Sequence, residues 1–306
     1  MPMKTRIIQS CAFAFLILFV GLGLSGCREE PAAFRFVFMT DIHLQPERNA
    51  GEGYAAAVEK VNQLKPRPDF VITGGDLIMD ALGQTYERAD SLYRLFLEIS
   101  QHLIPPAYHC IGNHELFGVY TQSGIDPSHP EYGKAMFKNR IGEGSTYRSF
   151  DHQGWHFILL DGIGITPERR YIGLIDEEQI EWLKQDLQKT GLDTPVVIAL
   201  HIPLFSVMTQ FLRGPLTPNT AGLVITNAKE VWDVCEDYNV RLVLQGHLHV
   251  VEDIGWRNTR FITAGAVSGK WWEGPYRGFE EGFVVVDVRG NDFDWTYETY
   301  GWQAER

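Results

Sequence analysis

Five short segments, far apart in the chain, place metal-binding side chains directly after runs of apolar residues. They are Asp41-Ile42-His43, Gly75-Asp76, Gly112-Asn113-His114-Glu115, His201 and Gly246-His247-Leu248-His249. Carboxylate oxygen and imidazole nitrogen suit borderline divalent ions such as Mn, Fe, Co or Zn, and the five segments contain no cysteine. Any one of these histidines alone is more simply explained as a hydrogen-bonded core or surface residue. Together they predict a site for two metal ions, of the kind that hydrolyses phosphate esters.

In two of these segments the metal-binding residues are separated by a single residue. Side chains two positions apart on an extended segment leave the same face of the backbone. We therefore expect Asp41 and His43 to hold one ion together, and we expect the same of His247 and His249.

The apolar runs before the segments are rich in β-branched and aromatic residues, which is typical of buried strands. Strands are predicted over residues 34–39, 70–73, 107–111, 155–160, 196–200 and 240–244. Helical spacing between these strands predicts four helices. One ends near Pro66, one covers Leu92 to Ile99, one runs from a capping Asp176 to Gly191, and one spans about 227–238.

The last part of the chain lacks helical patterns. Residues 260–263, 283–288 and 293–300 read as successive strands, which we expect to complete a second sheet. The predicted fold is α/β, a two-sheet sandwich flanked by helices rather than one doubly wound sheet. Because open α/β sheets bind ligands at the carboxyl ends of their strands, the dimetal site is predicted there.

The order and composition of the five segments resemble those of the calcineurin-like metallophosphoesterase superfamily, whose signature is DxH, GD, GNH[DE], H and GHxH. The resemblance covers Asp41 to His249. It implies that Asp76 bridges two ions. It also implies that one site is completed by Asp41, His43 and His249, and the other by Asn113, His201 and His247. His114 matches a histidine that is not a ligand in the family and lies beside the substrate phosphate.

The implied roles are chemically consistent. A bridging carboxylate holds two cations roughly 3.5 to 4 Å apart, which suits contact with both the attacking and the leaving oxygen. A hydroxide shared by the ions is available near neutral pH, so no nucleophilic side chain is required. An imidazolium at His114 would stabilise phosphate charge or protonate the leaving oxygen. For Glu115 we expect only a hydrogen bond to a ligand.

Two residues indicate which branch of the superfamily the chain resembles most. Met79 stands where purple acid phosphatases carry a tyrosine ligand, and His43 is present where they lack a histidine. The chain looks closer to the cyclic-nucleotide and glycerophosphodiester phosphodiesterases. The expected activity is hydrolysis of phosphodiesters or phosphomonoesters. Two alternatives stay open: a diphosphate-cleaving or phosphoprotein phosphatase on the same site, and a noncatalytic metal-containing envelope protein, against which His114 argues.

Three long segments are expected to form loops that select the substrate, namely residues 116–150, 163–173 and 203–224. Arg169 and Arg170 either reach a distal phosphate or are simply solvated. The segment Gly265 to Gly274, with adjacent Trp271 and Trp272, either forms a wall of the pocket or closes the second sheet.

The first residues are typical of an export signal, because Lys4 and Arg6 precede an apolar stretch from Ile7 to Leu24. The junction Leu24-Ser25-Gly26-Cys27 resembles the lipobox of bacterial lipoproteins. We therefore expect residues 1–26 to be removed, Cys27 to carry a lipid, and residues 27–306 to form one catalytic domain in the cell envelope. In a diderm host, Arg28 favours the outer membrane. A retained transmembrane helix is the alternative.

The net charge of −12 falls to −14 without residues 1–26, which disfavours nucleic acid as a partner and leaves small phosphate esters acceptable. Cys110 and Cys235 are expected to be buried free thiols. The metal pair and the oligomeric state are not indicated by the sequence.

Overall fold

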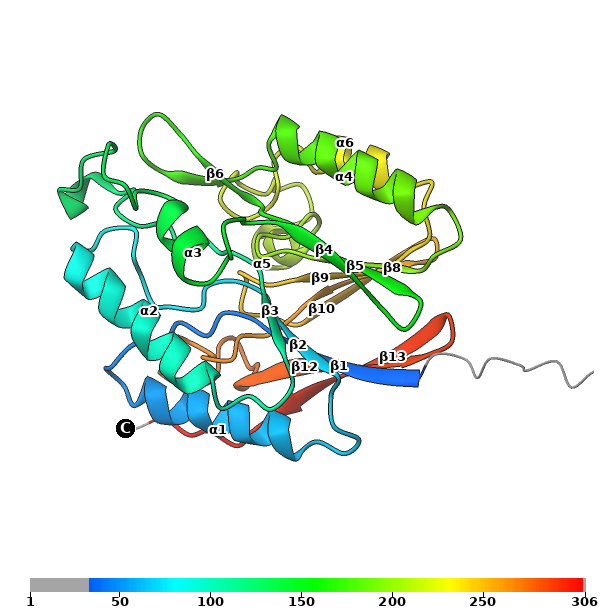
Figure 1. The fold of residues 1–306 in the computed structure, drawn as a ribbon, viewed down its shortest axis with the longest axis horizontal. Helices are drawn as coiled ribbons and strands as arrows, with labels where there is room; N and C mark the ends of the chain where they lie inside the picture. The colour runs from blue at the N-terminus through cyan, green and yellow to red at the C-terminus, as the bar shows by residue number, and fades with distance from the viewer. Residues whose placement is uncertain (1–32, 305–306) are drawn as a thin grey trace, which may run out of the picture. The chain divides into compact units, whose positions relative to one another are not determined.

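The computed structural model describes residues 33–304. The predicted signal segment and Cys27 lie outside the described residues. Within them, two main sheets lie face to face and helices cover the outer face of each (Figure 1). The predicted class, a two-sheet α/β sandwich flanked by helices, is confirmed. No helix of the described part is long and apolar enough to cross a bilayer.

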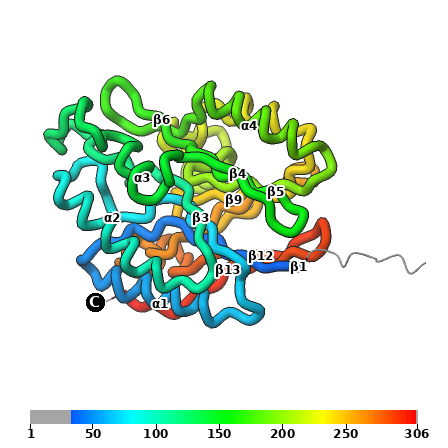
Figure 2. Tube along the Cα trace, viewed as in Figure 1, coloured from blue at the N-terminus to red at the C-terminus, as the bar shows by residue number. Residues whose placement is uncertain are grey.

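The first sheet has the strand order β13-β12-β1-β2-β3. Its parallel strands are β1 (Ala33–Met39), β2 (Phe70–Thr73) and β3 (Ala107–His109). The hairpin β12 (Gly282–Arg289) and β13 (Asp292–Thr299) joins the free edge of β1, with β12 antiparallel to β1. Figure 2 shows this red and orange hairpin beside the blue first strand.

The second sheet has the order β10-β11-β9-β8-β5-β4. Its parallel strands are β5 (Trp155–Leu159), β8 (Val196–Ala199), β9 (Val240–Gln245) and β11 (Thr259–Thr263). The edges are antiparallel: β4 (Arg148–His152) and β10 (Glu252–Trp256). A separate two-stranded ribbon is formed by β6 (Ile163–Ile165) and β7 (Tyr171–Gly173).

The helices cover the two sheets from outside. In Figure 1, α1 (Ala50–Gln63) and α2 (Tyr86–Ser100) lie on the first sheet, and α4 (Glu177–Thr190) and α6 (Ala228–Cys235) on the second. The predicted boundaries of α4 are confirmed, since Asp176 accepts a hydrogen bond from the Gln179 N–H and Gly191 ends the helix. Short helices α3 (Ala135–Arg140) and α5 (Met208–Arg213) and a 3₁₀ turn (Thr121–Ser123) lie in the connections.

Alternation along the strands produces two cores. Side chains of β1 alternate between them: Phe34, Phe36 and Phe38 pack between the sheets, whereas Val37 and Met39 face the helices. Between the sheets the ring of Phe36 stacks on Phe70 with centroids 5.2 Å apart. Cys110 and Cys235 are buried free thiols, as predicted.

Two predictions about elements are wrong. Only β11 of the three late strands joins the second sheet, because β12 and β13 complete the first. The cause is the open edge of β1, which β12 can cover since its valines are buried on both faces. The three expected loops also contain regular structure: α3 and the 3₁₀ turn in the first, the β6–β7 ribbon in the second, and α5 in the third.

Candidate metal centre

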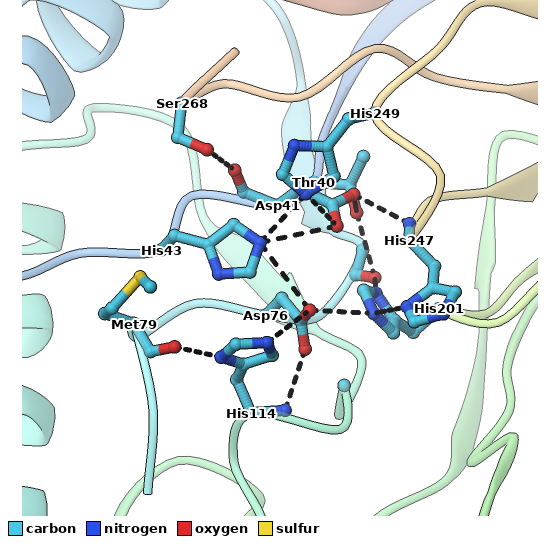
Figure 3. Close-up of polar contacts among 12 residues, drawn as sticks. Thr40, Asp41, His43, Asp76, Met79, His114, His201, His247, His249 and Ser268 are labelled. Carbon is cyan, nitrogen blue, oxygen red and sulfur yellow. Dashed lines mark hydrogen bonds and ion pairs between the residues drawn. The ribbon is translucent and has the colours of Figure 1, made fainter. Parts of the chain in front are cut away.

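The predicted site residues follow the carboxyl ends of five strands. Asp41 and His43 follow β1, Asp76 follows β2, and the loop after β3 carries Asn113 and His114. The second sheet contributes His201 after β8, and His247 and His249 after β9. Figure 3 shows the charged and imidazole side chains converging from these loops.

These side chains form three overlapping groups in which the ligand atoms lie within 4.8 Å of one another. The groups are Asp41, His43 and His249; His43, Asp76 and His114; and Asp76, His201 and His247. Asp76 belongs to two of them. Its Oδ2 lies 3.1 Å from His201 Nε2 and 3.6 Å from His43 Nε2. One carboxylate oxygen therefore faces both ends of the cluster.

The first group is equally compact. Asp41 Oδ1 lies 3.3 Å from His249 Nε2 and 3.7 Å from His43 Nε2, and the two histidine Nε2 atoms are 3.0 Å apart. At the other end of the cluster, His201 Nε2 and His247 Nδ1 are 3.1 Å apart. Four imidazole nitrogens thus converge on two carboxylates.

Backbone carbonyls determine which nitrogen of three histidines is available. His201 Nδ1 donates to Gly74 O over 2.8 Å, and His249 Nδ1 donates to Gly269 O over 2.6 Å. His247 uses the opposite nitrogen, since its Nε2 donates to the carbonyl of Gly222 over 2.8 Å. Because a carbonyl only accepts, the other nitrogen of each neutral ring presents its lone pair to the cluster.

The donor set fits divalent cations. Asp41 Oδ1 and Asn113 Oδ1 are buried acceptors that receive no hydrogen bond within the described residues. A buried oxygen without a partner destabilises the fold by about 1–3 kcal/mol, a cost that metal ligation removes. The donors are oxygen and nitrogen throughout, which suits the borderline ions expected from the sequence.

The electrostatics also favour positive charge here. Burial raises the pKa of Asp76, but His201, His114 and His43 outweigh it and hold that pKa well below its usual range. Burial lowers the pKa of His201, yet Asp76 and Asp41 outweigh burial and raise it to about 9. Burial and the charge of His201 lower the pKa of His247 to about 4. The two buried carboxylates thus make this cluster favourable for positive charge, which is the charge that divalent cations carry.

The backbone under these residues is not extended, so the predicted same-face geometry is wrong. Asp41 and His43 have φ of 55° and 46°, and His247 and His249 have φ of 71° and 54°. Left-handed conformations cost roughly 1–3 kcal/mol each in a non-glycine residue and cluster at functional sites. Asp41 and His43 still converge on one group, through strained turns rather than through strand alternation, whereas His247 and His249 fall in different groups and do not form a pair.

Two motif glycines allow the loops to approach one another. A Cβ at Gly112 would lie 2.3 Å from the backbone nitrogen of Asp76, and one at Gly246 would lie 2.1 Å from Thr40 Oγ1. Neither position accepts a side chain without moving a loop that carries site residues.

Glu115 holds the loops together. Its carboxylate accepts N–H groups from Gly112, Asp76, Leu77 and Ile78 over 2.7 to 3.2 Å. The expected hydrogen bond to a ligand therefore exists, but it reaches the backbone of Asp76 rather than its side chain. Glu115 thus fixes the position of the residue shared by two groups.

Several supporting residues were not predicted. Thr40 Oγ1 donates to Asp41 Oδ2 over 2.7 Å, and Ser268 Oγ donates to the carbonyl of Asp41 over 2.8 Å (Figure 3). Trp272 Nε1 donates to the carbonyl of His43 over 3.1 Å. Thr40 adjoins a motif and could have been noticed there. Ser268 and Trp272 lie in the segment Gly265 to Gly274 that the sequence singled out, but their partners could not be predicted, because over 200 residues separate them.

His114 differs from the other histidines in its exposure. Its side chain is 21% exposed, whereas that of His201 is 0% exposed. His114 Nδ1 donates to the carbonyl of Met79, so its Nε2 faces the cluster, 3.8 Å from Asp76 Oδ2. Its backbone N–H donates to Asp76 Oδ1 over 2.9 Å. A partly exposed imidazole thus stands at the open side of the site.

The two arginines considered for phosphate binding differ. Arg169 donates to the carbonyls of Gly118, Val119 and Ile125, so its guanidinium fixes a loop and is neither free for phosphate nor simply solvated. Arg170 is exposed and lies over the ring of Tyr120, 4.9 Å from its centroid. Of these two arginines, Arg170 is therefore the one whose guanidinium stays exposed.

Comparison with known proteins agrees with this geometry. The model of the calcineurin-like phosphoesterase family matches residues 34–251. A 3′,5′-cyclic-nucleotide phosphodiesterase of Nostoc sp. is 28% identical over 69% of this chain and 70% of its own length. A serine/threonine-protein phosphatase of Bos taurus is 27% identical over 69% of this chain and 63% of its own length.

Among solved structures, a dimetal phosphatase from Danio rerio superposes with a TM-score of 0.59 at 17% identity, covering 89% of this chain and all of its own. The Plasmodium protein GAP50, described as an anchor in the inner membrane complex, gives 0.56 at 14% identity, covering 88% of this chain and 85% of its own. At these identities the likeness concerns the fold. The family match covers strands of both sheets, β1 to β9, and every segment of the cluster, so the chain belongs to the calcineurin-like phosphoesterase family and is a metal-dependent phosphoric ester hydrolase.

Proposed function

We propose that the protein hydrolyses phosphodiesters at a two-metal centre, with phosphomonoesters as weaker substrates. The observation that carries the proposal is the position of Asp76, whose Oδ2 faces a histidine of each neighbouring group at 3.1 and 3.6 Å. A shared carboxylate between two donor sets is what a pair of closely spaced cations requires.

In this proposal Asp76 would hold both ions. The remaining ligands would be Asp41, His43 and His249 for one ion, and Asn113, His201 and His247 for the other. The ions are Mn, Fe, Co or Zn, because every donor is oxygen or imidazole nitrogen. When bound, two such ions supply positive charge for phosphoryl oxygens and lower the pKa of water to about 7.

The chain itself supplies orientation and a proton. The carbonyls of Gly74, Gly222 and Gly269 keep three rings in the orientation that presents a lone pair to the centre. The carbonyl of Met79 accepts from Nδ1 of His114, so in the imidazolium form Nε2 is the atom that would donate to a leaving oxygen. The partial exposure of His114 gives substrate access to that atom.

The preference for diesters rests on the relatives. Besides the Nostoc protein, a probable cyclic nucleotide phosphodiesterase of Xenorhabdus bovienii is 22% identical over 83% of this chain and 95% of its own length. The Bos taurus phosphatase keeps phosphoprotein hydrolysis as the second candidate. Cleavage of a diphosphate and a noncatalytic role in the envelope are outcomes that the experiment below distinguishes.

A substrate panel tests the proposal. Purified protein loaded with Mn, Fe, Co or Zn is assayed with bis-(p-nitrophenyl) phosphate, p-nitrophenyl phosphate, cyclic nucleotides, nucleoside diphosphates and a phosphopeptide. We expect diesters to have the highest kcat/KM. The opposite order, with the phosphopeptide or a diphosphate first, would assign the site to one of the alternatives. Two bound ions without any turnover would indicate a noncatalytic protein.

The export signal and lipid anchor remain part of the proposal, supported by the Leu24-Ser25-Gly26-Cys27 junction. The mature chain would then face the periplasm from the outer membrane of a diderm host. We expect Cys27→Ser to release the protein from membranes, measured by fractionation after a high-salt wash. A Cys27→Ser protein that still pellets would favour a retained transmembrane segment.

A further inference from the structure

The two adjacent tryptophans of the late glycine-rich segment face different surroundings. Trp272 is 1% exposed, and its ring meets Trp302 edge-on with centroids 5.9 Å apart. A Cβ added at Gly53 would lie 2.2 Å from Trp272 Cζ3, so the ring rests directly on α1. Trp272 thus packs against a helix of the first sheet (Figure 1), rather than closing the second sheet, which was one of the two expectations for this segment.

Trp271 lies beside the metal centre. Its ring centroid is 4.7 Å from that of His249, with the planes 41° apart, and 6.0 Å from that of His43. Tyr276 stands 5.9 Å from Trp271 and 5.8 Å from His249. Both aromatic residues are partly exposed. We call Trp271 and Tyr276 the aromatic shelf.

The shelf is held in an unfavourable backbone conformation. Trp271 and Trp272 have φ of 48° and 71°, which is unusual for bulky residues. Arg48 Nη1 donates to the carbonyl of Trp271 over 2.9 Å, and Arg48 also pairs with Glu273 at 2.9 Å. Ser268, which begins the turn, is bonded to Asp41 (Figure 3). The shelf is therefore rigid before a ligand arrives, which lowers the entropy lost on binding.

The opposite rim also carries aromatic rings and a cation. Tyr171 lies 6.1 Å from the ring of His247, and the exposed Arg170 covers Tyr120. On the shelf side the exposed Arg277 lies over Tyr276, 5.1 Å from its centroid, so each rim carries a guanidinium beside its aromatic rings. A substrate that uses both rims is a phosphate ester with a planar group.

We propose that the aromatic shelf binds an aromatic ring of the substrate, so that the substrate class is phosphate esters carrying a nucleobase or a similar planar ring. This rests on the proposed function, which places the phosphate at the metal centre. Rings stack on indole faces irrespective of their hydrogen-bonding pattern. The shelf lies beyond residue 251, where the family match ends, so it serves specificity within the family.

Equilibrium binding tests the inference without requiring turnover. Metal-loaded protein is titrated calorimetrically with AMP, phenyl phosphate and the ring-free glycerol 3-phosphate. We expect Trp271→Ala to weaken AMP binding by about 10- to 100-fold and to leave glycerol 3-phosphate within about 2-fold. Phenyl phosphate shows whether any aromatic ring suffices or a nucleobase is needed. Trp271→Phe should restore most of the AMP affinity.

Trp256→Ala is the matched control, because this tryptophan is 56% exposed on β10 and is expected to leave every affinity unchanged. Equal losses for AMP and glycerol 3-phosphate in Trp271→Ala would overturn the inference, as would a wild type that does not prefer AMP. Dependence of hexyl phosphate binding, but not AMP binding, on Trp271 would assign the shelf to an aliphatic chain instead. Trp271-dependent AMP binding without any hydrolysis would contradict the proposed function and leave the shelf intact.

Discussion

Residues 34–251 and residues 252–304 contribute to the same edge of the molecule in different ways. The first region, which matches the family, carries every residue of the three donor groups. The second region carries none of them, yet it hydrogen-bonds three of them through the hydroxyl of Ser268, the carbonyl of Gly269 and the indole of Trp272. The family-wide chemistry and its local support therefore come from separate stretches of sequence.

We expect the largest loss of activity from a substitution at the centre of the first region, residues 34–251. Asp76→Asn removes the charge that is shared between two donor groups, so we expect metal content to fall and kcat/KM to drop on the order of 10³-fold or more. Elemental analysis and diester assays measure both effects, with circular dichroism to confirm folding. A folded variant that keeps two ions and full activity would show that Asp76 is not the bridge.

His114→Ala tests whether, within the first region, the residue that acts on the substrate is distinct from the residues that bind the metal ions. We expect both ions to stay bound while turnover falls by roughly 10²- to 10⁴-fold. The loss should be large for an alkyl leaving group and small for p-nitrophenolate, which departs without a proton. Equal losses would favour stabilisation of phosphate charge over proton donation. Loss of an ion would instead make His114 a ligand, as its place in the His43 and Asp76 group allows.

We expect substitutions in the second region, residues 252–304, to lower the stability of the fold. Trp272→Ala leaves a cavity against α1 and removes the hydrogen bond to His43, so we expect the free energy of unfolding to fall by about 3–5 kcal/mol. Trp272→Phe, which fills most of the space without the N–H donor, should lose about 1 kcal/mol. Urea denaturation measures both, with Trp256→Ala as the exposed control. A Trp272→Ala protein of normal stability would contradict the assigned role of this region.

The sequence predicted the strands and their functional ends well, because buried strands such as β2 and β8 are continuous apolar runs followed by polar motifs. It failed where the answer depended on distant partners. Nothing within β12 and β13 shows that they pair with β1 rather than with β9, since only the open edge of β1 decides this.

The candidate site shows the same limit. The residue types at Asp41, Asp76 and His201 were sufficient to predict that these side chains converge. They were not sufficient to predict the local backbone geometry. A spacing of two suggested an extended segment, but hydrogen bonds from Ser268 and Trp272 to the carbonyls of Asp41 and His43 hold this backbone in conformations that local propensity disfavours. The role of Arg169 in fixing a loop could not be predicted either, because its carbonyl partners are 44 to 51 residues away.

The pairing of β1 with β12 also affects how the chain reaches its native state. Arg35 and Asp287 are joined by an ion pair although 252 residues separate them. At about 5–20 residues per second, synthesis delivers β12 roughly 10 to 50 s after β1. During that interval the aromatic strand β1 has an uncovered edge and cannot finish its sheet. The first sheet therefore stays incomplete until the last hairpin of the chain has been synthesised.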